Sequence, residues 1–168
     1  MLSEISKPKV KDKICIIHYA CSDFSKIPLK ISVITLLEFK TKKFYTFSIL
    51  KSNEKEMLEE FYEYIRDHTD NIFVGWNLKN DTYGLQVIER RYKQVTGCEV
   101  PIRLEHVFDL DSIFQKKYGS CYVSHGIFGK MYSLFALNGV NLEHFIEGKR
   151  EAELFDKEDI RKIEMSNI

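Results

Sequence analysis

The stretch that decides the fold runs from Phe73 to Leu85 and reads FVGWNLKNDTYGL. A short apolar run ends in Gly-Trp-Asn at Asn77, and Asp81 follows four residues after that asparagine. A helical pattern then begins, so the stretch predicts a buried strand that leads into a helix. A carboxylate at such a junction, beside basic residues, is placed to hold a metal ion or a phosphate backbone.

Three segments before this stretch have the β-branched and aromatic composition of strands. They are residues 13–20, 29–39 and 42–50, and the short link at residues 40–41 predicts that the last two form a hairpin. A helix is expected next, because Asn53 and Glu56 have the spacing of a capping box.

Strands and helices alternate after residue 72. Residues 72–76 and 107–110 are expected strands, and between them lies a helix that packs Leu85, Ile88, Tyr92 and Val95 inward and stops before Gly97. Residues 113–118 read as a helical turn, and residues 128–146 and 147–168 are helical in pattern. Asp111 is either a carboxylate that the fifth strand adds to a site, like Asp109, or with Ser112 the cap of the turn at residues 113–118. This order predicts an α/β fold of three layers, in which helices flank a mixed five-stranded sheet with three antiparallel strands first and parallel strands after them.

The composition of the chain limits the classes of protein to which it can belong. The chain has 168 residues, and its 25 Lys and Arg balance its 25 Asp and Glu, which argues against a strongly basic nucleic-acid binder but permits a local basic patch. No apolar run approaches the roughly 18 residues of a membrane span. The four cysteines form no C-x-x-C pair and are expected to be reduced thiols, so we expect a cytoplasmic protein without membrane partners. Residues 1–12 are expected to be a flexible lead-in and residues 13–168 one domain.

These features resemble the ribonuclease-H-like fold and, within it, the DEDD (DnaQ-like) group of 3′–5′ exonucleases. Asn77 followed at +4 by Asp81 is similar to the group's second motif, an asparagine and a metal-binding aspartate at a helix start. Residues 107–110 are similar to the strand after that helix. Residues 148–164 are similar to the segment that leads into the third motif of the polymerase-associated branch.

The departures from the resemblance concern the metal ligands. Active members carry Asp-x-Glu on the first strand, where this chain has His18 and Ala20, and Asn80 replaces the aromatic residue before the second-motif aspartate. The third-motif aspartate is expected a few residues beyond Ile163, where the printed sequence ends with Glu164 to Ile168. Either the chain is part of a longer protein or its branch has lost that motif. The resemblance therefore implies a degenerate member.

Two-metal phosphodiester hydrolysis explains why these losses matter. The reaction needs two ions about 3.5–4 Å apart that bridge the attacking and leaving oxygens. A lone Asp81 cannot hold two ions, and a nitrogen donor such as His18 suits Mn²⁺ better than Mg²⁺. We therefore expect no cofactor, or Mg²⁺ or Mn²⁺ if the chain is active with Asp81, Asp109 and His18 as its reworked site.

Most candidate residues also have a structural interpretation. Asp81 is either a metal ligand or the N-cap of the next helix, and Thr82 is the alternative cap. Trp76 stacks on a base or fills the core at the strand end. His18 is a ligand or a buried histidine with a satisfied ring.

The basic residues near Asp81 suggest a phosphate contact. A nucleic-acid backbone would be contacted, if they line a groove, by Asn77, Lys79, Arg90, Arg91 and Lys93. The alternative is that Arg90, Arg91 and Lys93 form a solvated helix face.

Three hypotheses about function follow from the sequence. The leading one is an exonuclease-like module that binds single-stranded nucleic acid, or docks other domains of a longer chain, without catalysis. The others are an active metal-dependent 3′–5′ exonuclease and a purely structural protein-interaction domain.

Overall fold

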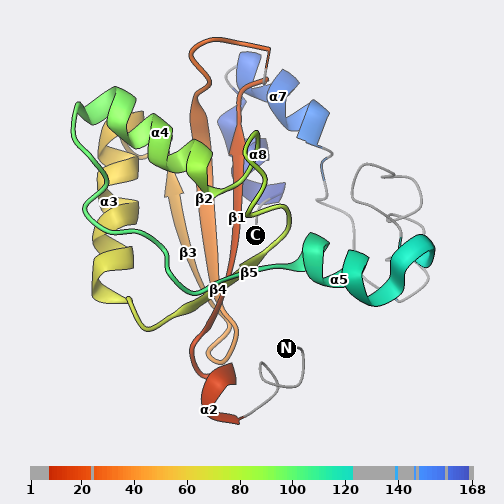
Figure 1. The fold of residues 1–168 in the computed structure, drawn as a ribbon. Coiled ribbons are helices and arrows are strands. Elements are labelled where there is room, and N and C mark those ends of the chain that lie inside the picture. The colour runs from red at the N-terminus through yellow and green to blue at the C-terminus, as the bar shows by residue number, and fades with distance from the viewer. Residues whose placement is uncertain are drawn as a thin grey trace.

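A computed structural model describes residues 8–23, 25–122, 139, 146, 148–157 and 159–166. Its centre is a five-stranded sheet with the strand order β3-β2-β1-β4-β5 (Figure 1). The strands are β1 (Ile14–Cys21), β2 (Ile31–Glu38), β3 (Lys43–Ser48), β4 (Ile72–Gly75) and β5 (Val107–Asp109).

The pairing of the strands is mixed, as the element order predicts. β2 pairs antiparallel with both β1 and β3, and β4 pairs parallel with both β1 and β5. The first three strands are joined by short connections, whereas each parallel strand follows a helical crossover. The expected fold class is therefore confirmed.

Helices cover both faces of the sheet and make it the middle layer. On one face, α3 (Glu54–Asp67) and α4 (Leu85–Thr96) pack on Ile17 and Tyr19 of β1 in the larger core. On the other face, α7 (Gly148–Asp156) and α8 (Ile160–Ser166) pack on Ala20 of β1 in a smaller core. Because side chains alternate along a strand, neighbouring residues of β1 face these two separate cores.

Local sequence signals account for the start of α3 and the end of α4. The Asn53 side chain accepts a hydrogen bond from the Glu56 N–H at the start of α3, as expected for a cap. Gly97 ends α4 with a φ of 75°, a left-handed conformation that glycine adopts without strain. The inward positions Leu85, Ile88 and Tyr92 are buried as predicted.

Two helix boundaries differ from expectation. α5 (Leu110–Tyr118), followed by the 3-10 turn η1 (Gly119–Cys121), begins three residues early. Its cap is Asp109, whose side chain accepts from the Asp111 N–H, so the expectation that Asp111-Ser112 caps this helix is wrong. The helix α2 (Pro8–Lys11) also shows that the expected flexible lead-in includes a helical turn at its end.

The remaining expectations fall partly on described residues. The helical pattern over residues 147–168 corresponds to α7 and α8, in which Leu154, Ile160 and Ile163 are buried. The helical pattern over residues 128–146 lies almost wholly outside the described residues. All four cysteines are free. No helix within the described ranges is both long and apolar enough to cross a membrane.

Candidate nucleic-acid interface and metal site

The loop from Trp76 to Gly84, which joins β4 to α4, carries the Asn77/Asp81 motif. Asn77 has a φ of 58°, a left-handed conformation that asparagine tolerates better than most residues. Leu78 is buried beneath the loop, and its carbonyl accepts from the Leu85 N–H at 2.9 Å. The Asn80 side-chain oxygen accepts from the backbone N–H groups of Thr82 and Tyr83. The loop is therefore built mainly from its own polar groups.

Close packing of the backbone fixes the exit of this loop. A Cβ at Gly84 would lie 2.3 Å from the Leu78 carbonyl oxygen and 2.5 Å from the Asn80 carbonyl oxygen. Both neighbours are backbone atoms that cannot rotate away, so position 84 requires glycine.

Asp109 at the end of β5 supports the same loop from below. This buried carboxylate accepts from the backbone N–H groups of Asn77 at 3.0 Å and Lys79 at 3.2 Å. It also accepts from the Asp111 N–H and the Ser112 hydroxyl at the start of α5. A carboxylate with four donors has its lone pairs occupied, so Asp109 positions the loop and the helix rather than facing an open site.

Asp81 lies at the exposed surface of the loop. The Arg90 guanidinium donates to its backbone carbonyl at 2.8 Å, which ties the loop to α4. No hydrogen bond or ion pair among the described residues uses the Asp81 carboxylate. The N-cap of α4 is Gly84, without a side-chain hydrogen bond, so the expectation that Asp81 or Thr82 caps this helix is wrong. The reason is that Tyr83 and Gly84 extend the loop before the helix begins.

Tyr83 also connects the loop to β1. The rings of Tyr19 and Tyr83 stack with centroids 4.8 Å apart and planes at 18°. Each hydroxyl donates to the backbone carbonyl of the other residue. Burial raises the pKa of both tyrosines, so both hydroxyls stay protonated as donors at neutral pH. The second-motif loop is thus fixed to the strand on which the first motif is expected.

β1, the strand on which the first motif is expected, holds no Asp or Glu. His18 is exposed on β1, which corrects the interpretation that it is a buried histidine. Ala20 lies on the same face and is buried against Val33 and Leu154. Nowhere in the described part of the chain do three His, Cys, Asp or Glu side chains converge as a metal site would require. The described residues therefore do not fit a two-metal centre, and His18, Asp81 and Asp109 are not brought together as one.

The predicted basic cluster is divided by the structure. Arg91 is buried and forms a bidentate ion pair with Glu54 of α3, at 2.7 Å and 2.6 Å. This pairing corrects the interpretation of Arg91 as a groove residue, because its donors point into the protein. Lys93 is exposed and pairs with Glu99. Lys79 and Arg90 remain exposed at or beside the loop.

An aromatic cluster next to the loop was not predicted from the sequence. Trp76 is half-buried and contacts the rings of Phe114 and Tyr122, with centroids 5.5 and 6.4 Å apart. The Trp76 indole N–H and the Tyr122 hydroxyl both donate to Asp111. Tyr118 continues the cluster and is 49% exposed. The helical spacing of Phe114 and Tyr118 is the one sequence signal that could have indicated it.

The sequence matches a known protein family. A family model described as DNA polymerase family B, exonuclease domain, matches residues 3–136. The chain belongs to this family. None of the curated proteins matches the sequence.

The exonuclease-domain fold is also seen in a solved structure. The family B DNA polymerase from the hyperthermophilic archaeon Pyrobaculum calidifontis matches with a TM-score of 0.63 and 11% identity, over 92% of this chain and 22% of that polymerase. At this identity the likeness shows the fold alone. The chain therefore corresponds to about a fifth of the length of that polymerase, 22%.

Proposed function

We propose that this exonuclease domain binds single-stranded nucleic acid and has lost two-metal hydrolysis. The observation that carries the proposal is that β1 contains no Asp or Glu, with His18 and Ala20 where the first motif is expected, while Asp109 is occupied by backbone donors. Without a carboxylate that bridges two ions, the ion pair has no anchor on this strand. The scaffold around the second motif is nevertheless fully formed.

The binding surface that we propose lies around the Trp76–Gly84 loop. Lys79 and Arg90 supply exposed positive charge, and Asn77 holds the loop in its left-handed turn. Tyr118 presents a partly exposed ring beside Lys117. Positive side chains that contact phosphates, together with rings that stack on bases, are the means by which proteins bind single strands without reading sequence.

Binding of a fluorescein-labelled oligothymidine, measured by anisotropy across a salt series, tests this proposal. We expect affinity that falls as salt rises, because bound cations are released from the phosphates. Lys79→Ala and Arg90→Ala should each weaken binding and reduce the salt slope. Lys40→Ala is the matched control, since Lys40 lies in the β2–β3 turn at the opposite end of the sheet. Absence of binding at low salt would contradict the proposal and favour a structural docking module.

Asp81 supports a second candidate, a metal-dependent 3′–5′ exonuclease. Its carboxylate is exposed and makes no hydrogen bond with the described residues, which leaves it available to an ion. Degradation of a 5′-labelled single strand in Mg²⁺ or Mn²⁺ would support this candidate, provided that Asp81→Asn abolishes it. Either candidate would be one domain of a longer chain, since the match covers only 22% of the polymerase.

A further inference from the structure

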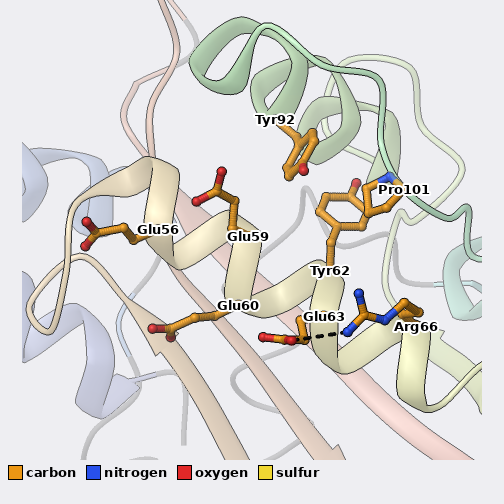
Figure 2. Close-up of a pocket in the computed structure, with 8 residues that line it drawn as sticks. All are labelled: Glu56, Glu59, Glu60, Tyr62, Glu63, Arg66, Tyr92 and Pro101. Carbon is orange, nitrogen blue, oxygen red and sulfur yellow. Dashed lines mark hydrogen bonds and ion pairs between the residues drawn. The ribbon is translucent and has the colours of Figure 1, made fainter.

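A groove of about 410 Å³ opens on the side of the molecule formed by α3 and α4 (Figure 2). It lies between the outer face of α3, Tyr92 near the end of α4, and Pro101 in the segment that follows. None of its lining residues belongs to the Trp76–Gly84 loop. The groove is therefore a separate feature from the proposed nucleic-acid surface.

The rim of the groove is strongly acidic. Glu56, Glu59, Glu60 and Glu63 are exposed along successive turns of α3. Glu59 has Lys55 at 3.9 Å and Glu63 has Arg66 at 3.1 Å. Glu56 and Glu60 have no cationic partner among the described residues. The lining thus contains four carboxylates and one guanidinium, that of Arg66, which pairs with Glu63.

The floor of the groove contains a polar atom without a partner. Tyr62 is 1% exposed, and its hydroxyl makes no hydrogen bond within the described residues. The Tyr92 ring meets the Tyr62 ring edge to face, with centroids 4.8 Å apart, and Figure 2 shows the two side chains pointing toward one another. Because buried hydroxyls are nearly always hydrogen-bonded, this one indicates a missing partner.

The chemistry of the lining selects the kind of partner. A single metal ion does not fit, since no three carboxylates converge within the described residues. An organic cation does fit: its N–H groups can donate to the Tyr62 oxygen and to the glutamates, and its charge is attracted to tyrosine ring faces. Its aliphatic stem can pack on Pro101 and Tyr92, as lysine and arginine stems do.

We infer that this groove binds a lysine or arginine side chain presented by a basic segment of a partner protein. The four glutamates are exposed, so the groove does not enclose a ligand as small-molecule sites do. A side chain delivered by a larger partner gains further contacts from the acidic rim, which spans two turns of α3. Charge complementarity at such a rim speeds association and makes it sensitive to salt.

Anisotropy of fluorescein-labelled hexaarginine, with labelled hexaglutamate as the negative probe, tests the inference. We expect the wild-type chain to bind hexaarginine in 50 mM salt and not hexaglutamate. The double variant Glu56→Gln/Glu60→Gln should bind about fivefold more weakly, roughly the effect of removing two rim charges. Glu153→Gln, which removes an exposed charge from α7 on the other face of the sheet, should leave affinity unchanged.

Tyr62→Phe tests the contribution of the groove floor to binding independently of the charges on the rim. It should weaken hexaarginine binding without lowering the thermal unfolding midpoint, because it removes a hydroxyl that has no partner. Failure of hexaarginine to bind, or equal weakening by Glu153→Gln, would overturn the inference. Competition by spermine at the same concentration as the peptide would also overturn it, in favour of a free polyamine. Retained oligothymidine binding in the double variant would show that the two surfaces are independent.

Discussion

Arg91 and Glu54 join α4 to α3 through a bidentate ion pair in which both side chains are largely covered, at 10% and 14% exposure. Glu54 Oε1 also accepts from the Ile31 N–H at 2.7 Å. One carboxylate therefore links α3, α4 and the start of β2. The pair holds together the layer that carries the second-motif loop.

Breaking this ion pair should destabilise the protein strongly. Arg91→Ala leaves the largely covered Glu54 carboxylate without its cationic partner, and we expect a loss of about 3 kcal/mol in the free energy of unfolding. Arg90→Ala is the matched control, because Arg90 is exposed, and it should cost less than about 1 kcal/mol. Urea denaturation followed by circular dichroism measures both. Equal losses for the two variants would contradict the structural role of Arg91.

Substitution of Gly84 should distort the second-motif loop. In Gly84→Ala the new Cβ would contact two backbone carbonyls at 2.3 and 2.5 Å, so the loop must move. We expect a loss of about 2 kcal/mol, within the range for overpacked sites. Gly97→Asn is the comparison, since position 97 is open and asparagine tolerates a positive φ. A Gly84→Ala variant as stable as wild type would show that the loop is not tightly packed.

Stability should fall on acidification because of Glu38. Hydrogen bonds from Thr41, followed by those from Tyr45 and Tyr64 and the charge of Lys43, lower the pKa of this carboxyl in the folded state. Its stabilising contribution is present above the pKa of the unfolded chain, and it is lost as the pH falls through the lower folded pKa. Glu38→Gln should therefore flatten the pH dependence of the unfolding midpoint below about pH 4.5. An unchanged slope would contradict this assignment.

Thiol reactivity should divide the cysteines into two pairs. Cys98 and Cys121 are exposed, whereas Cys15 and Cys21 are buried, and burial raises the pKa of both buried thiols to about 12. The thiolate is the reactive form. An aromatic disulfide reagent at pH 8 should therefore titrate two thiols rapidly in the folded protein and all four in denaturant. Rapid reaction of a third thiol in the folded protein would show that β1 opens readily.

The sequence predicts the sheet and its main helices because hydrophobic periodicity and turn residues act locally. The three antiparallel strands, the Asn53 cap and the Gly97 stop all depend on neighbouring residues, and the structure has them where they are expected. The parallel pairing of β4 also follows from the alternation of strands and helices, whereas the order of the strands in the sheet comes from the structure.

The site could be predicted only in part, because its side-chain roles depend on distant partners. Arg91 looks like one of a basic trio in the sequence, yet Glu54, far earlier in the chain, determines its burial. The period of α4 does place Arg91 three residues after Ile88, on the inner face. Asp109 looks like a free acid at a strand end, and only the fold shows that Asn77 and Lys79 occupy it.

The central claim is that this exonuclease domain keeps its strand-binding scaffold without a two-metal centre. Its most direct test is a paired assay on one 5′-labelled oligothymidine, in which binding is measured first and the product ladder is measured after Mg²⁺ or Mn²⁺ is added. We predict salt-dependent binding and an intact oligonucleotide with either ion. Stepwise shortening from the 3′ end that disappears in Asp81→Asn would contradict the claim.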